Sequence, residues 1–144
     1  MAQFGNIDDS TFKTFVDRVG NEVKAKTYLT KATKRMNTVA NYAIRQVKPL
    51  TPVGRYPASA HKTGGTLRRS WSRSDVNYTS RALVVKISNN QDYASFVENG
   101  HRTRSGGWVN GRFMLKKALK ETEQRTLTQT QKELDEYINK LLGG

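Results

Sequence analysis

Apolar residues recur at intervals of three and four positions over the first third of the chain. Phe12 and Val19 belong to a first set, and a second set follows after a polar stretch. This spacing predicts a helical segment over residues 1–48. Gly20 interrupts the pattern, which therefore fits either one long helix or two helices joined near residues 20–27. The second set is Tyr28, Leu29, Ala32, Met36, Val39, Ala40, Ala43 and Val47.

The helical pattern stops at Pro49, which has no amide hydrogen to donate and disfavours helix in the residue before it. Residues 49–66 contain three prolines and three glycines, a composition that predicts a long loop with a functional role or one ordered by a neighbour. Residues 66–71 fit a short helical turn before a strand. Asp8, Asp9 and Ser10 offer side-chain oxygens that suit the N-terminal cap of the first helix.

Two β-rich runs follow the loop, over residues 71–76 and 81–88, with turn-forming residues 77–80 between them. They predict a β-hairpin within residues 67–92. Two strands alone are marginal in water, so we expect either a third strand from the loop regions or completion of the sheet by a neighbouring chain. Trp71 is expected in the core.

The stretch after the hairpin joins a short helix to a long one. Residues 93–100 predict one or two helical turns that end at Gly100, with Tyr93 and Phe96 expected in the core. Residues 101–112 predict a basic, glycine-rich loop, and residues 113–142 a long helix. The apolar stripe of this last helix fits ordinary packing or a coiled-coil seam. Its members are Leu115, Leu119, Leu127, Leu134, Ile138 and Leu141.

These elements predict a single α+β domain over residues 1–144. An N-terminal helical segment and a long C-terminal helix would pack on a small antiparallel β-sheet. The apolar fraction is only 35%, which favours elongated helices with wet faces or surfaces completed by partner subunits.

Composition narrows the possible chemistry. The chain has no cysteine, which excludes disulfides, thiolate metal sites and a cysteine nucleophile. No apolar run has the length of a membrane span, and the first ten residues lack the apolar core of a signal peptide, so we expect a protein made in the cytoplasm and no membrane partner. No cofactor is expected.

The net charge of +13 is uneven along the chain. Residues 1–48 hold nine Lys/Arg against four Asp/Glu, and residues 49–81 hold six against one. Such a field attracts polyanions but carries no sequence readout. The charge therefore indicates a basic surface and does not by itself indicate a DNA-binding function.

Four short motifs then occur in a recognisable order: a Thr-Pro pair, a Thr-Gly segment that leads into Leu-Arg-Arg-Ser-Trp, a Tyr-Ala-x-x-Val-Glu-x-Gly stretch, and an Arg-Phe helix start. They are Thr51-Pro52, residues 63–71, residues 93–100 and residues 112–119. In this order the chain resembles the tail-component (tail-completion, neck) family of tailed bacteriophages, over roughly residues 49–120. It departs from the family pattern by an insertion between Pro52 and Thr63, and by His101 where a small hydroxyl residue is common.

The resemblance implies a structural protein of the virion, not an enzyme, at the neck or upper tail. It implies a homo-oligomeric ring and contacts with other neck and tail proteins: a head–tail connector or stopper, a tail terminator and the tail tube. DNA would pass through the ring and be held without sequence specificity.

Two sets of residues are candidates for these contacts. The two loops would supply subunit or tail-tube contacts through Arg55, Tyr56, Arg102, Arg104, Trp108 and Arg112. The basic segment around the hairpin would face the DNA channel, or be solvated, through Arg68, Arg69, Arg73 and Arg81.

Other interpretations remain open at this point. The residues of the second loop fit phosphate binding as well as docking on a neighbouring subunit. A metal site could be built from Asp92, Glu98 and His101, with His61. Their spacing is looser than that of known metal motifs, so no metal site is predicted. The sequence has no nucleophile elbow, so no catalytic set is predicted either. The alternative function is a stand-alone basic DNA-binding protein.

Overall fold

The computed structural model describes residues 9–24, 27–79 and 82–143. The N-terminal segment forms two helices, α1 (Asp9–Lys24) and α2 (Thr27–Leu50), so the second of the two helical alternatives is correct. Asp8 lies outside the described residues, as does the side chain of Asp9. Helix α2 runs through Pro49 and ends one residue beyond it.

The loop after α2 is irregular except for a 3-10 turn at Ala58–Ala60, and α3 (Thr66–Arg69) is the expected short helical turn. A long hairpin then runs back along α2. Its four short strands are β1 (Trp71–Arg73), β2 (Asn77–Tyr78), β3 (Leu83–Val84) and β4 (Ile87–Asn89).

Strand β1 pairs antiparallel with β4, and β2 pairs antiparallel with β3. The two ladders belong to one hairpin, because the Ser74 N–H donates to the Lys86 carbonyl between them at 2.8 Å. Among the described residues no third strand joins either ladder. The first of the two expectations for completing the sheet is therefore wrong, and completion by a neighbouring chain stays a prediction.

The last part of the chain contains α4 (Ala94–Asn99), β5 (Gly100–Arg102), β6 (Trp108–Asn110) and α5 (Met114–Leu141). Helix α4 ends at Gly100, whose φ of 85° suits glycine, as predicted. Strands β5 and β6 pair antiparallel with each other, so the basic loop expected over residues 101–112 is a β-hairpin.

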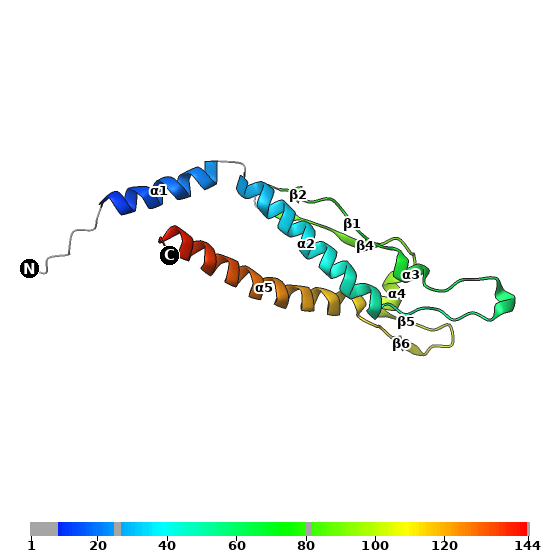
Figure 1. The fold of residues 1–144 in the computed structure, drawn as a ribbon. Coiled ribbons are helices and arrows are strands. Elements are labelled where there is room, and N and C mark those ends of the chain that lie inside the picture. Colours follow the sequence, from blue (N-terminus) through cyan, green and yellow to red (C-terminus); the bar gives the residue numbers. More distant parts are fainter. Residues whose placement is uncertain (1–8, 25–26, 80–81, 144) are drawn as a thin grey trace, which may run out of the picture.

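Helices α2 and α5 lie side by side, and the β1–β4 ladder packs along another side of α2 (Figure 1). The core lies at the end where α2 stops and α5 begins. Its fully buried members come from α2, α3, β1 and α5, which makes this end the place where all layers meet. They are Val47, Leu67, Trp71, Met114 and Ala118.

The molecule is elongated, and helix α1 lies at the end opposite to α4 and β5–β6 (Figure 1). The fold is α+β, with N-terminal helices, a long C-terminal helix and small antiparallel sheets, as the sequence predicts.

Candidate functional site: a buried joint that carries two arms

The core end of the molecule is built around one buried hydroxyl group. Thr51 is fully buried. Its hydroxyl donates to the Val47 carbonyl at 2.7 Å and accepts from the Trp71 indole N–H at 2.8 Å. This side chain therefore fixes the last turn of α2 to the first residue of β1, and both polar groups are satisfied without water. We call this region, with Met114 and Ala118 of α5, the joint.

Glu98 fixes the start of α5 to the same joint. Its carboxylate accepts hydrogen bonds from the backbone N–H groups of Leu115 and Lys116, each at 3.0 Å. The first turn of a helix leaves N–H groups without partners, and a carboxylate there also interacts favourably with the helix dipole. The sequence analysis left Glu98 as a candidate metal ligand or helix anchor; the structure makes it an anchor of the following helix.

Backbone contacts hold the two helices together at this corner. The Arg112 and Phe113 N–H groups donate to the Val97 and Glu98 carbonyls at 2.8 and 3.0 Å. A Cβ built on Gly111 would lie 2.3 Å from the Glu98 carbonyl oxygen, so glycine is required for this approach. The Val-Glu-x-Gly stretch and the start of α5 thus form one rigid corner.

The loop over residues 52–65 projects from the joint, and we call it the loop arm (Figure 1). Its two limbs meet at the base, where a Cβ built on Gly64 would lie 2.0 Å from the Gly54 carbonyl oxygen. At its tip the Ala60 N–H donates to the Pro57 carbonyl at 2.9 Å, which closes the 3-10 turn. The arm is therefore pinched at its base and ordered at its tip by local bonds.

The hairpin over residues 100–112 is the second projection, and we call it the hairpin arm. A tight turn closes it: the Thr103 N–H donates to the Gly107 carbonyl at 2.9 Å, and the Gly106 N–H donates to the Thr103 carbonyl at 3.1 Å. Gly106 has a φ of 87°, which favours glycine. Its turn chemistry converts the expected basic loop into a β-hairpin.

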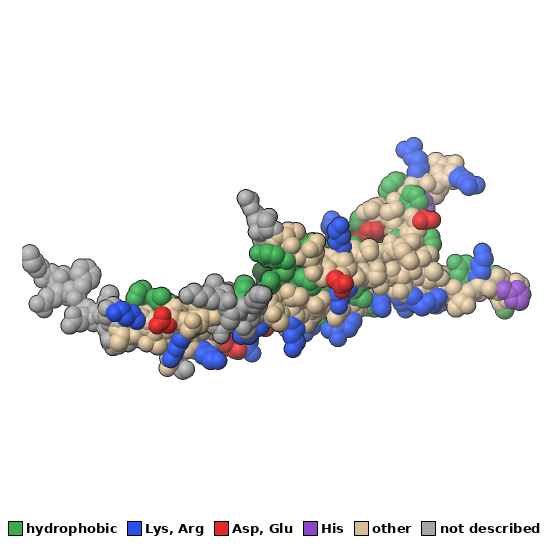
Figure 2. Space-filling view, turned by 90° about the horizontal axis from the view of Figure 1, so that it is seen from above, with side chains coloured by type: hydrophobic (Ala, Val, Ile, Leu, Met, Phe, Trp, Pro, Cys, Tyr) green, Lys and Arg blue, Asp and Glu red, His purple; other side chains and the backbone are tan. Residues whose placement is uncertain are grey.

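Both arms leave the same end of the molecule but diverge, as the view from above shows (Figure 2). All six residues predicted for assembly contacts lie on these arms with exposed side chains. Arg55 and Tyr56 are on the loop arm, and Arg102, Arg104, Trp108 and Arg112 are on the hairpin arm. The structure thus gathers them at one end, in two separate groups.

Three of the residues predicted to face a DNA channel form hydrogen bonds within the molecule. Arg68 donates twice to the Thr51 carbonyl, at 2.9 and 3.2 Å, and Arg69 donates to the Gly64 carbonyl at 3.1 Å. Arg73 reaches α2 and donates to the Asn41 side-chain oxygen at 2.7 Å. Arg81 lies outside the described residues. The partners of these three guanidinium groups are neutral carbonyl and amide oxygens.

Two aromatic side chains are less buried than the sequence analysis expects. Trp71 is in the core, but Phe96 is 56% exposed and Tyr93 is also exposed. Phe96 lies on α4 and Tyr93 is the N-cap residue of that helix, so the chain itself leaves one side of this short helix uncovered. The Phe96 ring meets the His101 ring edge-on at 5.8 Å.

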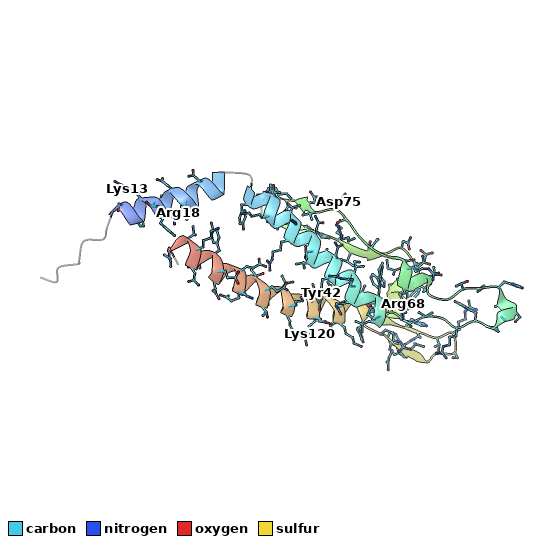
Figure 3. The ribbon with its side chains drawn as sticks, in the orientation of Figure 1. Lys13, Arg18, Tyr42, Arg68, Asp75 and Lys120 are labelled. Carbon is cyan, nitrogen blue, oxygen red and sulfur yellow. The ribbon has the colours of Figure 1, made fainter. Side chains whose placement is uncertain are left out.

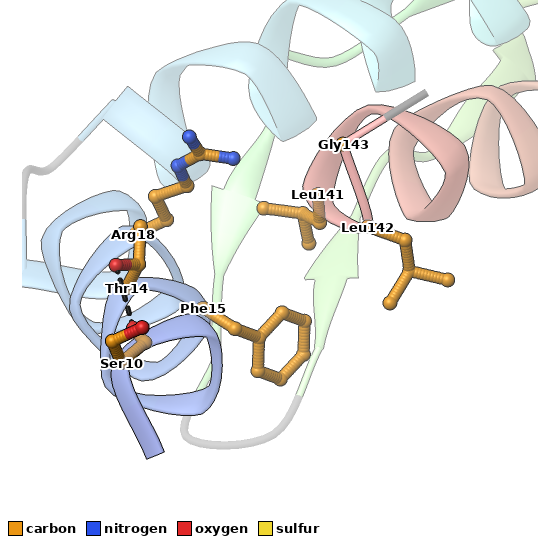
Figure 4. Close-up of a pocket in the computed structure, with 7 residues that line it drawn as sticks. All are labelled: Ser10, Thr14, Phe15, Arg18, Leu141, Leu142 and Gly143. Atoms are coloured by element: carbon orange, nitrogen blue, oxygen red, sulfur yellow. Dashed lines mark hydrogen bonds between the residues drawn. The ribbon is translucent and has the colours of Figure 1, made fainter. Parts of the chain in front are cut away.

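Among the described residues, no group of three or more His, Cys, Asp or Glu side chains lies close enough together to hold a metal ion. A cleft of about 270 Å³ lies at the far end of the molecule, between α1 and the end of α5 (Figure 4). Phe15, Leu141 and Leu142 line it, and Arg18 is its one charged lining residue.

Comparison with known families covers the part of the joint that precedes α5. A family model described as bacteriophage HK97-gp10, putative tail-component, matches residues 9–100, more than half of the chain. The chain belongs to the HK97-gp10-like family. The match runs from α1 to the end of α4, so it includes Thr51 and Glu98 and stops where the hairpin arm begins.

Family membership makes this chain a structural component of a bacteriophage tail, and thereby a part of the virus particle. It agrees with the resemblance drawn from the motifs, although the family model extends further towards the N-terminus than the motifs did. No curated protein and no solved structure matches the chain. No helix in the described ranges combines the length and apolar character needed to span a membrane.

Sequence reasoning missed the role of Thr51 and the partners of Glu98. Thr51 was noted as part of a motif, but its burial was not foreseen. A signal was present, because a threonine placed directly before a proline at a helix end can satisfy the last turn through its hydroxyl. The partners of Glu98 lie 17 and 18 residues further along the chain, so spacing rules for a single helix do not reveal them.

Proposed function

We propose that this family member assembles with copies of itself into a ring at the neck or upper tail of a tailed phage, and that the two arms make the contacts. The observation that carries the proposal is the placement of exposed apolar side chains on the arms. Trp108 is 63% exposed and Tyr56 is 52% exposed. Large aromatic residues together with arginine are the residue types that dominate binding energy at protein interfaces.

The geometry of the arms suits a head-to-tail arrangement. Both arms project from one end, while the strands of the β1–β4 hairpin, each paired on one side within the described chain, lie along the body. An arm of one copy that docks on the body of the next makes a heterologous contact, and such contacts close into a ring when the rotation between copies allows it. The exposed strand edge offers backbone groups for such docking.

The ring would surround the path of the DNA. A net charge of +13 supports this part of the proposal, because a basic lining holds a passing duplex by its phosphates without reading its sequence. Other neck and tail proteins, such as a connector or stopper, a tail terminator and the tail tube, would meet the faces of the ring that the arms leave uncovered.

Mass photometry of the purified protein without DNA tests the assembly. We expect a discrete oligomer for the wild type and a dissociation constant raised roughly thirtyfold by Trp108→Ala, the effect of losing about 2 kcal/mol at an interface hot spot. Tyr28→Ala is the matched control, because Tyr28 is 71% exposed but lies at the start of α2, outside both arms and outside the strands proposed for docking. Equal effects of the two substitutions would remove the arms from the proposal.

The position in the virion needs a second measurement. Cryo-electron microscopy of phage particles that carry this protein should show its density around the axis between portal and tail tube. Density elsewhere in the particle, or a working form that is a single closed molecule, contradicts the proposal. A monomer whose DNA affinity falls steeply as the salt concentration rises would instead favour the stand-alone DNA-binding alternative.

A further inference from the structure

Helix α2 carries a one-sided set of charges. It contains five Lys/Arg and no Asp/Glu over its 24 residues. Six of its positions follow a three-and-four spacing that places them on one face of a helix. All six have exposed side chains. We call this face the α2 ridge: Lys31, Lys34, Thr38, Asn41, Arg45 and Lys48.

Three cations of the ridge are not neutralised by acidic side chains in the described part of the chain. Arg35, the remaining cation of α2, forms an ion pair with Glu133 of α5. By contrast, Lys34, Arg45 and Lys48 have no ion-pair partner within the described part of the chain. The view from above shows Lys and Arg side chains along one edge of the molecule with few acidic ones between them (Figure 2).

A further cation from the hairpin is fixed beside the ridge. The Arg73 guanidinium donates to the Asn41 side-chain oxygen at 2.7 Å and to the Ser74 carbonyl at 3.1 Å. These bonds hold the guanidinium against the ridge and leave it with other N–H donors. Asp75 is the acidic residue nearest to it in sequence, and its side chain is exposed on the hairpin (Figure 3).

The surface beside the ridge is also polar. A shallow hollow of about 550 Å³ runs along α2, and Thr33, Asn37 and Asn41 are among its lining residues. Hydroxyl and amide groups between cations are the groups that proteins use, with Lys and Arg, to contact phosphate and sugar. The ridge itself has no aromatic or large apolar residue, which is the kind of anchor a protein partner would need.

The other long helix shows that this pattern is not required of an exposed face. Helix α5 mixes both signs and contains an i,i+4 pair between Lys132 and Glu136. Such mixing supports a helix, whereas like charges at this spacing oppose it. The unmixed ridge therefore indicates a surface kept for a polyanion.

We propose that the α2 ridge, supplemented by Arg73, is the surface of this protein that binds the phosphates of duplex DNA without sequence preference. This inference rests on the proposed function, in which DNA passes along the protein. In it the ridge takes the place of Arg68 and Arg69 as the surface that faces the DNA, since those two side chains bond to the carbonyls of Thr51 and Gly64. Lys31 and Lys48 are separated by about 25 Å along the helix, estimated from its rise, a span that covers many duplex phosphates.

Fluorescence anisotropy with a labelled random-sequence duplex, measured across a range of NaCl concentrations, tests the ridge. The ridge variant is the full-length chain with Lys34→Gln, Arg45→Gln and Lys48→Gln. If each residue contacts one phosphate, the plot of log affinity against log salt should become shallower by about 2 to 3, and affinity near 0.1 M salt should fall on the order of a hundredfold.

The matched control removes the same charge from the solvent face of α5, with Lys116→Gln, Lys117→Gln and Lys120→Gln. All three side chains are exposed, and Lys120 lies on the side of α5 away from α2 (Figure 3). This variant should keep the wild-type salt slope. Equal losses in the two variants, or a ridge variant that binds like the wild type, would overturn the inference. Circular dichroism melting curves, compared for all three proteins, establish that each variant is folded.

Two further outcomes separate this inference from the proposed function. If the protein is a monomer and the ridge variant still has a lower DNA affinity than the wild type, the ring proposal is wrong and the ridge proposal holds. If the oligomer forms and neutralising the ridge leaves DNA binding unchanged, the ridge fails and the ring stands. Poly-L-glutamate serves as a second polyanion in the same assay. If the wild type binds it as tightly as DNA, and the ridge variant loses affinity for both to the same extent, the surface is assigned to an acidic protein instead.

Discussion

The two ends of the α2–α5 pair are held together in different ways. At the joint, Val47, Met114 and Ala118 are fully buried against each other. Further along the pair the contacts are polar: the Tyr42 hydroxyl donates to Glu121 at 2.9 Å, and Arg35 pairs with Glu133. Tyr42 lies between the two helices (Figure 3), with the Arg125 guanidinium over its ring.

This difference indicates where the fold obtains its stability. Burial of apolar surface is the main favourable term in folding, and it is concentrated at the joint. Polar contacts between exposed helices contribute little by comparison. The joint can therefore hold the arms in place, while the far end leaves apolar residues such as Leu127 and Leu134 exposed.

The largest expected effect breaks the joint. Met114→Ala removes the largest fully buried side chain and should lower the free energy of unfolding by about 2–5 kcal/mol, because it creates a cavity that the packed surroundings cannot fill. Leu127→Ala, at a position 64% exposed on the same helix, should change it by less than about 0.5 kcal/mol. Urea unfolding of both variants checks the contrast, and similar losses would contradict it.

An intermediate effect is expected from the buried hydroxyl. Thr51→Val keeps the shape of the side chain but leaves the Trp71 indole N–H without its acceptor. We expect a loss of about 1–3 kcal/mol, the cost of an unsatisfied buried donor. Urea unfolding followed by tryptophan fluorescence measures it. Trp71→Phe removes the donor, so the double variant should lose less than the sum of the two single variants; strict additivity would show that the hydrogen bond is unimportant.

The smallest effect is expected at the polar end. Arg35→Gln removes the ion pair with Glu133, whose side chain is 59% exposed, and should cost no more than about 1 kcal/mol. Because the pair is exposed, the difference between variant and wild type should shrink further at high salt. Thermal melts at low and high NaCl concentration provide the measurement. A loss as large as that of Met114→Ala would mean that both ends stabilise the fold equally.

Local chemistry in the sequence predicted the order of elements well. Gly100 ends α4 and residues 66–69 form a turn, because glycine and short polar residues act on the backbone within a few positions. Residues 101–112 were expected as a basic, glycine-rich loop, and its strands could not be placed from the sequence, since the closing turn depends on the bonds between Thr103 and Gly107. Helical period alone also cannot tell whether an apolar face is covered, which is why Phe96 was expected in the core.

The candidate site was predictable only in part, for a similar reason. The arms could be recognised from their glycine and arginine content, and their residues lie exposed as interface residues must. The roles of Arg68 and Arg73 depend on partners 17 and 32 residues away in sequence. Contacts over such distances are set by the packing of the hairpin on α2, which no local pattern specifies.

The pinch at the base of the loop arm has one practical consequence. Gly54 and Gly64 are in close backbone contact at the base of the loop arm. The number of residues between them can therefore change without moving the two ends of the loop. The insertion that distinguishes this chain from the motif pattern lies between Pro52 and Thr63, largely within that stretch. A peptide tag or fluorescent label placed near His61 would therefore report on the arm while leaving the joint undisturbed.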